Sequence, residues 1–339
     1  MTAEDEVPRG HLNIIEALLG RYGFRPRAVL PVPASVLNRN YRVEADGRVL
    51  FVRIHATKRD GDRVLREHRA AAWALAHGIP SAAPLADPES STLHRIGGAF
   101  VSLYPWVEGR TATRGALSAV EAETLGGLLG RLHVVLADYA DPTLETGKVG
   151  SHWDTEEAIN NLSRVDDLIR YYPAISDEQM RVLTALRHQL GLLEGGEAAP
   201  SDPFSVLERQ PCHGDFHERN VLLAADGGVA AVVDWELVSL LPPVYELLRA
   251  VTFLGLLDAP ARFETFLQAY RRWKSLDVDT CRAGVEMRWQ AMLHDTWAYR
   301  AVYVEGNRRA AQFFAEHDRE IRRFSDPAFR VALAVRLAG

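Results

Sequence analysis

Short apolar runs alternate with polar turns over the first hundred residues of the chain. Residues 41–43 and 49–52 are rich in β-branched and aromatic side chains, and they flank Asp46-Gly47, a pair typical of the tight turn in a β-hairpin. Residues 100–104 form another run of this kind. The pattern therefore predicts antiparallel strands, with a hairpin over residues 41–52.

One amphipathic segment lies between these strands. Asp62 precedes it as a candidate N-cap, and Gly78 and Pro80 follow it, which is the usual way for a helix to end. The apolar positions recur at helical spacing: Leu65, Ala72, Leu75 and Ala76. We expect a helix that begins near Asp62 and ends at Gly78.

After residue 115 the pattern is mostly helical. Ser118 and Glu121 have the spacing of a capping box, and leucines recur behind them at helical intervals. Pro105 and Gly109 bracket a short connecting segment that precedes this helical part of the chain, so we place the boundary between two lobes in that segment. The predicted domains are an N-lobe, residues 1–107, with strands and one helix, and a C-lobe, residues 108–339.

Composition narrows the class of protein. The 339 residues are 47% hydrophobic and 25% charged, as in ordinary globular proteins. A formal charge of −6 gives no basic surface for a nucleic acid, and no apolar stretch is long enough to span a membrane. The two cysteines cannot form a disulfide framework, and the acidic N-terminus does not resemble a leader. We expect a cytoplasmic protein with neither nucleic-acid nor membrane partners.

A strand-rich island at residues 213–236 lies within the helical half. It begins with the polar loop His213-Gly214-Asp215-Phe216-His217-Glu218-Arg219-Asn220 and ends with Asp234-Trp235-Glu236. Between them, two apolar runs flank the turn Asp226-Gly227-Gly228, which predicts a hairpin. Because facing residues of antiparallel strands lie roughly 5 Å apart, this hairpin should bring Asn220 beside Asp234.

The two residues that meet in this way both offer oxygen ligands. An amide oxygen from Asn220 and a carboxylate from Asp234 suit a hard cation such as Mg²⁺, which usually completes its shell with water and substrate phosphates. Asp215, five positions before Asn220, then remains available to face a substrate hydroxyl group. The island therefore predicts a magnesium site next to a further carboxylate.

These residues closely resemble the catalytic loop and metal segment of the aminoglycoside phosphotransferase and choline kinase group, written H-G-D-x-x-x-x-N, a strand pair, and I-D-W/F-E/D. Protein kinases use H-R-D-x-x-x-x-N and D-F-G, in which the first Asp orients or deprotonates the acceptor and the Asn and second Asp hold Mg²⁺. This chain has Gly214 and Trp235-Glu236 instead, and Pro242-Pro243 leaves no room for a long activation segment. The resemblance favours a small-molecule kinase.

The resemblance implies an α+β, protein-kinase-like fold with a small antiparallel-sheet N-lobe and a larger, mainly helical C-lobe. It makes Asp215 the catalytic group and Asn220 and Asp234 the ligands of Mg²⁺. His217 stands where protein kinases have a catalytic-loop lysine and is a second catalytic candidate. Glu236 is a candidate for a second metal or the substrate, with a structural salt bridge as the equal alternative.

The resemblance extends to the first lobe. Glu67 and the later Gly78-Ile79-Pro80 are similar to the family's E-x-x-x…L-x-x-x-G-I-P helix, which makes Glu67 the partner of a phosphate-binding cation. That cation is normally a lysine on the preceding strand, and this chain offers Arg53, which can contact phosphate with two N–H groups. An ordinary surface ion pair of Arg53 and Glu67 is the alternative.

Two further segments correspond to nucleotide-binding parts of the family. Residues 31–41 occupy the nucleotide loop but contain no glycine, so the loop either clamps differently or uses Ser35 and Asn38 as hydrogen-bond donors. Residues 103–109 resemble the linker between the lobes, whose backbone pairs with the adenine edge. Tyr104 and Trp106 are therefore further candidates for nucleotide binding.

The resemblance thus implies an enzyme that moves the γ-phosphoryl group of ATP or GTP to a hydroxyl group of a small molecule, with Mg²⁺ as cofactor, as a monomer or homodimer. An aminoglycoside or other antibiotic is the leading acceptor, in resistance or self-protection. A metabolic kinase of an amino alcohol, homoserine or amino sugar is the first alternative. The second is a non-catalytic nucleotide-binding pseudokinase, which would explain the glycine-free loop and the missing strand lysine.

Overall fold

The computed structural model describes residues 7–32, 38–56, 59–146, 153–171, 174–198 and 207–339. The chain forms two compact units, each assembled from several stretches of sequence. The first consists of Met1–Glu145, Pro211–Ser239 and Ala250–Lys274, and the second of Thr146–Gln210, Leu240–Arg249 and Ser275–Gly339. The lobe boundary that we expect after residue 107 divides the chain in another way, and it stays a prediction.

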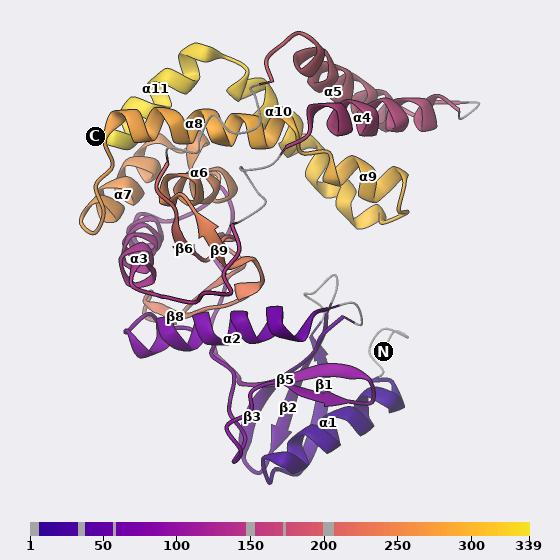
Figure 1. Cartoon of the computed structure of the whole chain (residues 1–339), viewed down its shortest axis with the longest axis vertical. Helices are drawn as coiled ribbons and strands as arrows, with labels where there is room; N and C mark the ends of the chain where they lie inside the picture. The colour runs from indigo at the N-terminus through magenta and orange to yellow at the C-terminus, as the bar shows by residue number, and fades with distance from the viewer. Residues whose placement is uncertain (1–6, 33–37, 57–58, 147–152, 172–173, 199–206) are drawn as a thin grey trace. The chain divides into compact units, whose positions relative to one another are not determined.

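The first unit contains a five-stranded antiparallel sheet in the order β1-β2-β3-β5-β4 (Figure 1). Its strands are β1 (Pro26–Val32), β2 (Arg39–Ala45), β3 (Arg48–Ile54), β4 (His94–Ile96) and β5 (Ala99–Pro105). β2 and β3 form the predicted hairpin, and the turn residues Asp46 and Gly47 have φ angles of 48° and 76°. Two positive φ angles are what a two-residue hairpin turn requires. The predicted strands at 41–43, 49–52 and 100–104 are confirmed.

One face of this sheet is covered by helix α1 (Arg9–Arg21). Ile15, Leu18 and Leu19 of the helix are fully buried against alternate side chains of the strands, including Val43 and Val52. Alternation with period two places these strand residues on the same face. The helix and the sheet therefore share one apolar core.

The predicted amphipathic helix is α2 (Gly61–Ala76). Its N-cap is Asp60 rather than Asp62, because the Asp60 side chain accepts a hydrogen bond from the backbone N–H of Asp62. The helix ends as expected: Gly78 has a φ of 82°, a left-handed conformation that favours glycine. This helix carries Glu67 on its buried face.

Helix α2 is tied to the segment that follows α3 by a buried carboxylate. Arg69 binds Asp141 at 2.8 Å, and the backbone N–H of Thr143 donates to the same carboxylate at 2.9 Å. Burial alone would raise the pKa of Asp141, but the hydrogen bonds from Arg69 and Thr143 outweigh it and hold the pKa below its ordinary value. The ionised form of Asp141 is therefore the one that stabilises the fold.

We expect Asp141→Asn to lower the melting temperature at neutral pH. Because the pKa of Asp141 is depressed in the folded protein, its contribution is present above the ordinary aspartate pKa and is lost as the pH falls below about 4. The difference between variant and parent should therefore shrink from pH 7 towards pH 3 in thermal unfolding scans. The exposed neighbour Asp138→Asn is the control, and an equal pH profile for both variants would contradict the assignment.

The strand pair β7 (Val221–Leu223) and β8 (Val229–Val232) forms the hairpin predicted in the island. Both strands are held by neighbouring backbone. On one side, the N–H of Val232 donates to Pro80 at 2.7 Å, and on the other, Arg110 and Leu223 exchange two hydrogen bonds of 2.9 and 2.8 Å. The segment after α2 and the linker after β5 thereby fix the hairpin within the first unit.

Helix α3 (Ala119–Ala137) begins at the predicted capping box of Ser118 and Glu121, and it packs against α7 (Pro260–Arg271). Two glycines face the contact. A Cβ atom at Gly126 would lie 2.1 Å from the Phe266 carbonyl oxygen, and one at Gly130 would lie 2.7 Å from that of Tyr270. Glycine at these two positions therefore allows the two helix backbones to approach closely.

We expect Gly126→Ala to lower the free energy of unfolding by about 1–3 kcal/mol, because the added methyl group meets backbone that can move only with its helix. The neighbouring Gly127→Ala is the matched control. A Cβ atom there would lie 3.9 Å from Nε1 of the Trp273 indole, an ordinary van der Waals distance, so the higher helix propensity of alanine should leave stability unchanged or raised by up to about 1 kcal/mol. Urea unfolding of both variants checks this, and equal midpoints would refute the close approach.

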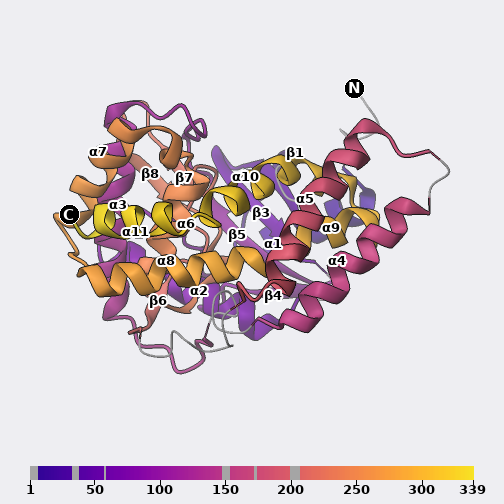
Figure 2. The same cartoon turned by 90° about the horizontal axis from the view of Figure 1, so that it is seen from above.

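The second unit is mainly helical. Figure 2 shows α4 beside α5 and α8 beside α11, and residue contacts join the members of both pairs. Its elements are α4 (Thr155–Arg170), α5 (Asp177–Glu194), α8 (Val278–Leu293), α9 (Trp297–Tyr303), η3 (Arg308–Phe313), α10 (Phe314–Phe324) and α11 (Pro327–Ala338).

The remaining elements are short. η1 (Trp235–Leu237) and η2 (Leu256–Asp258) belong to the first unit, whereas β6 (Gln210–Cys212), β9 (Ser239–Leu241) and α6 (Pro243–Phe253) contain residues of both units. Among the helices described, none combines the length and the apolar character that crossing a lipid bilayer requires.

Candidate active site

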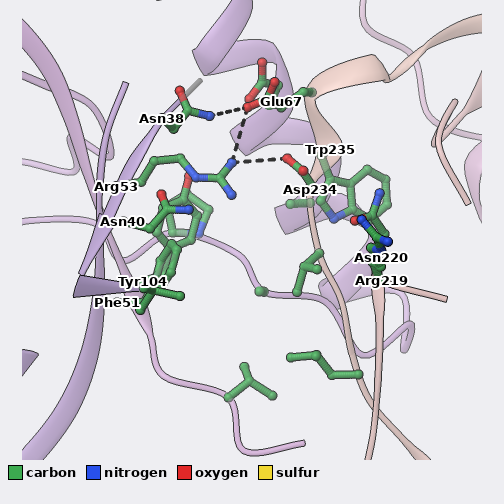
Figure 3. Close-up of a pocket in the computed structure, with 18 of the residues that line it drawn as sticks. Asn38, Asn40, Phe51, Arg53, Glu67, Tyr104, Arg219, Asn220, Asp234 and Trp235 are labelled. Atoms are coloured by element: carbon green, nitrogen blue, oxygen red, sulfur yellow. Dashed lines mark hydrogen bonds and ion pairs between the residues drawn. The ribbon is translucent and has the colours of Figure 1, made fainter. Parts of the chain in front are cut away.

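A cavity of about 880 Å³ lies in the first unit, between residues of its sheet, α2 and the island (Figure 3). The described candidates from the sequence all line it: Asn38, Arg53, Glu67, Tyr104, Trp106, Asp215, His217, Asn220, Asp234 and Glu236. Ser35 lies outside the described residues. Residues up to 198 positions apart in the chain thus share one cavity.

The polar loop of the island owes its shape to His213 and Gly214. The imidazole Nε2 of His213 hydrogen-bonds the Val233 carbonyl at 3.0 Å, and its Nδ1 accepts from the backbone N–H of Asp215 at 3.3 Å. Gly214 has a φ of 84°, and a Cβ atom there would lie 2.2 Å from the Leu237 carbonyl oxygen. The position therefore requires glycine, and the bulkier arginine of protein kinases would not fit.

Asn220 directs its amide N–H groups at Asp215. Its Nδ2 lies 2.9 Å from the Asp215 backbone oxygen and 3.1 Å from Oδ2 of the carboxylate. These contacts fix the orientation of the amide, since the nitrogen must face Asp215. The amide oxygen of Asn220 is then the atom left to bind a cation.

His217 lies against the same carboxylate. Its Nδ1 accepts from the backbone N–H of Arg219 at 3.1 Å, so the proton of the neutral ring sits on Nε2. Nε2 lies 3.3 Å from Oδ2 of Asp215, to which it can donate, and 3.2 Å from Nδ2 of Asn220, so the three side chains meet. The ring also makes an edge contact with Phe253, with centroids 6.1 Å apart. Asp215 is thus held by both Asn220 and His217.

The hairpin places Asp234 beside Asn220, as predicted. Val221 pairs with Val232, and one residue further along, the N–H of Val233 donates to the Asn220 carbonyl at 2.9 Å. Asp234 itself has a φ of 63°, which is uncommon for a residue with a side chain and marks a strained position of the kind that gathers at functional sites. Its side chain is 40% exposed, so the carboxylate can be reached from the cavity.

Arg53 projects from β3 towards these carboxylates. Its Nη1 lies 3.3 Å from Oδ1 of Asp234, a contact that a dashed line marks in Figure 3, and 3.6 Å from Oε1 of Glu236. Burial alone would lower the pKa of Arg53, but the surrounding acidic groups, with Tyr104 and Asp234 foremost, hold it above its ordinary value. The guanidinium therefore stays charged in the cavity.

Glu67 differs from the expectation, because its ion pair is with Arg59 and not with Arg53. Arg59 lies just before the N-cap of α2, and its other terminal nitrogen binds Oε2 of Glu236 at 2.5 Å. Burial raises the pKa of Glu67 to about 7, and the neighbouring Arg59 opposes this rise. Sequence reasoning missed Arg59, which stands outside the family's motifs. The signal in the sequence is a basic residue just before the N-cap of the helix that carries Glu67.

Asn38 also takes part in this network. Its Oδ1 accepts from the backbone N–H of Ala56 at 3.1 Å, and its Nδ2 donates to Oε1 of Glu236 at 2.5 Å. Here the side chain that we expect to face phosphate holds a carboxylate instead. Both oxygens of Glu236 are thus engaged, one by Asn38 and one by Arg59.

An aromatic wall completes the cavity. Phe51 lies between Tyr104 and Trp106, with centroid distances of 5.9 and 6.4 Å. The Tyr104 hydroxyl lies 3.1 Å from Nε2 of His68, and burial and the nearby Arg53 lower the pKa of His68 to about 4. The imidazole is therefore neutral near pH 7, and it fixes Tyr104 through a hydrogen bond. Flat rings at this side suit a planar heterocycle.

Solved structures of known proteins have the same fold. One, an amicoumacin kinase in complex with AMP-PNP and Ca²⁺, matches with a TM-score of 0.63 at 18% identity and covers 93% of each chain. A spectinomycin phosphotransferase in complex with ADP and spectinomycin matches with 0.64 at 14% identity, over 95% of this chain and 97% of its own. A microcompartment-associated aminopropanol kinase matches with a TM-score of 0.59 at 16% identity, over 95% of this chain and 99% of its own.

These likenesses confirm the predicted α+β, protein-kinase-like fold. No curated protein matches the sequence. The family of phosphotransferase enzymes does match it, over residues 28–283, which include all but the first two residues of the sheet, the island and every candidate site residue. The chain therefore belongs to the phosphotransferase enzyme family and is a small-molecule phosphotransferase, as its catalytic loop predicts.

Proposed function

We propose that the protein moves the γ-phosphoryl group of ATP or GTP to a hydroxyl group of a small molecule. The observation that carries this proposal is the cluster of Asp215, Asn220 and Asp234 on the same cavity as Arg53. Phosphoryl transfer needs a group that orients the acceptor, oxygen ligands for a cation and positive charge near the phosphates. The cavity offers side chains for each of these.

Asp215 is the group to which we assign the acceptor hydroxyl. The carboxylate can orient the hydroxyl and take its proton as the new oxygen–phosphorus bond forms. The bond from the γ-phosphorus to the β–γ bridging oxygen breaks in the same transfer, and the nucleoside diphosphate leaves. Asn220 and His217 hold this carboxylate from one side, which fixes its direction. We therefore assign His217 as a positioning residue that acts through Asp215.

Asn220 and Asp234 fit a hard divalent cation. The amide nitrogen of Asn220 is engaged with Asp215, which leaves an oxygen as its donor, and Asp234 adds a carboxylate. Mg²⁺ prefers such oxygen ligands and, when bound, neutralises charge on the transferred phosphoryl group. We propose these two residues as its ligands. Glu236 is better explained by the structural alternative, because Asn38 and Arg59 engage its two oxygens.

We assign the nucleotide to the rest of the cavity. Tyr104 and Trp106 with Phe51 form a surface for the base, and Arg53 lies towards Asp234, where the phosphates would meet the cation. Two of the similar structures contain AMP-PNP and ADP. The proposed roles of Arg53, Tyr104 and Trp106 rest on this arrangement of the cavity.

For the acceptor, we propose an antibiotic that carries a hydroxyl group, such as an aminoglycoside. Two of the similar structures are an amicoumacin kinase and a spectinomycin phosphotransferase. The aminopropanol kinase supports an amino alcohol as the alternative acceptor.

The test is mass-spectrometric detection of phosphate addition across aminoglycosides, other antibiotics, amino sugars, homoserine and amino alcohols, with Mg-ATP and Mg-GTP. A product that forms with the parent and not with Asp215→Asn would identify the acceptor class and the donor. Tight nucleotide binding without product on any acceptor would favour the pseudokinase instead.

A further inference from the structure

Two carboxylates at the edge of the cavity share one guanidinium. Arg59 donates through Nη2 to Oε1 of Glu67 and through Nη1 to Oε2 of Glu236, the latter at 2.5 Å. The three side chains are only 11%, 6% and 18% exposed. Charges so little hydrated need a partner, because an uncompensated buried carboxylate is strongly unfavourable.

Arg53 is the neighbouring cation that would have to replace Arg59. Its Nη1 is already 3.6 Å from Glu236, and the negative charge of Glu67 also acts on it. Without Arg59, the carboxylate of Glu236 would draw the guanidinium of Arg53 towards itself. Glu67 would instead take up a proton, because burial already raises its pKa to about 7 while Arg59 opposes the rise. Arg53 would then leave the side of the cavity that faces Asp234, where it now lies at 3.3 Å.

We propose that Arg59 is a positioning residue for nucleotide binding, which keeps Arg53 available to the phosphates by neutralising Glu236. The inference rests on the proposed phosphotransferase function, since it assumes that phosphates bind at Arg53. Arg59 does not line the cavity, so it acts through its neighbours and has no direct contact with the ligand.

The test compares Arg59→Gln, Arg59→Lys and Arg63→Gln in the full chain, by calorimetric titration with Mg-AMP-PNP. Arg63 is the matched control, because this exposed arginine of α2 reaches Glu236 only at its backbone oxygen, at 3.3 Å. Arg59→Gln should weaken nucleotide binding roughly tenfold or more, the scale of a hydrogen bond to a charged group. Arg59→Lys should lie between Arg59→Gln and the parent, and Arg63→Gln should match the parent.

A double variant separates positioning from a general effect on folding. If Arg59 acts by neutralising Glu236, then Arg59→Gln/Glu236→Gln should bind nucleotide more tightly than Arg59→Gln alone, because the carboxylate that competes for Arg53 is gone. A purely structural role of Arg59 would give no such recovery. Where Arg59→Gln does not fold, the intermediate affinity of Arg59→Lys and its recovery by Glu236→Gln carry the test.

The outcomes distinguish this inference from the function beneath it. Parent-like affinity in Arg59→Gln, or no recovery in the double variant, would overturn the role of Arg59 and leave the proposed function intact. A parent protein that binds no nucleotide at all would overturn the proposed function, and the inference with it.

Discussion

Replacing Asp215 with asparagine should lower turnover by roughly 10²–10⁴-fold, the scale of a lost general base, with nucleotide affinity nearly unchanged. Asparagine has the same shape and can still accept a hydrogen bond from Asn220, so the loop should keep its structure. It has lost the negative charge and the basicity that the acceptor hydroxyl needs. Formation of the nucleoside diphosphate in the presence of the acceptor measures turnover, and calorimetry measures nucleotide binding, so the two effects are observed separately.

The control for this variant is Asp226→Asn. Asp226 lies in the turn of the same hairpin, where its side chain accepts from the backbone N–H of Gly228 at 2.9 Å. The chemical change is the same, but the site is a turn, so turnover should remain close to that of the parent. Unreduced turnover in Asp215→Asn would remove Asp215 from its proposed role.

Asp234→Asn should abolish the dependence of nucleotide binding on Mg²⁺ and lower turnover by at least roughly 10²-fold. Substitutions of residues that only contact the ligands of a metal already lower metal affinity or activity by roughly 10–100-fold. The substitution is a clean probe because asparagine tolerates the left-handed backbone of Asp234, whose φ is 63°. The loss should therefore come from the missing charge and not from a distorted strand end. Calorimetry with and without Mg²⁺ checks the prediction.

Glu236→Gln provides the comparison for this second variant. Because Asn38 and Arg59 occupy the two oxygens of Glu236, this change should preserve the dependence on Mg²⁺. Loss of that dependence in Glu236→Gln would restore Glu236 as a metal ligand. An Asp234→Asn variant that still needs Mg²⁺ as the parent does would refute the assignment of Asp234.

Local patterns predicted the elements that carry the site. Asp46-Gly47 predicted the first hairpin, Ser118 and Glu121 predicted the start of α3, and the apolar runs of the island predicted the pairing that brings Asn220 to Asp234. Each depends on a turn or cap whose chemistry is contained in a few neighbouring residues.

The charge network could not be predicted in this way. Arg59 and Glu236 are 177 positions apart, and nothing in their local sequence indicates that they meet. The family pattern offered Arg53 for Glu67, whereas the competition between two arginines is decided by which guanidinium lies nearer after folding. Only the three-dimensional structure resolves such a choice.

The shared guanidinium of Arg59 also affects how relatives of this protein should be judged. A comparison that requires the usual strand lysine for activity would class this chain as an inactive kinase, because position 53 is arginine. In the arrangement that we propose, two arginines share the role of that lysine: Arg59 pairs with Glu67 and Glu236, and Arg53 lies towards Asp234. An arginine in place of the strand lysine can therefore indicate a site with a different set of ion pairs. Relatives are better compared by all the charged side chains around Glu67 and Glu236 than by the residue at position 53 alone.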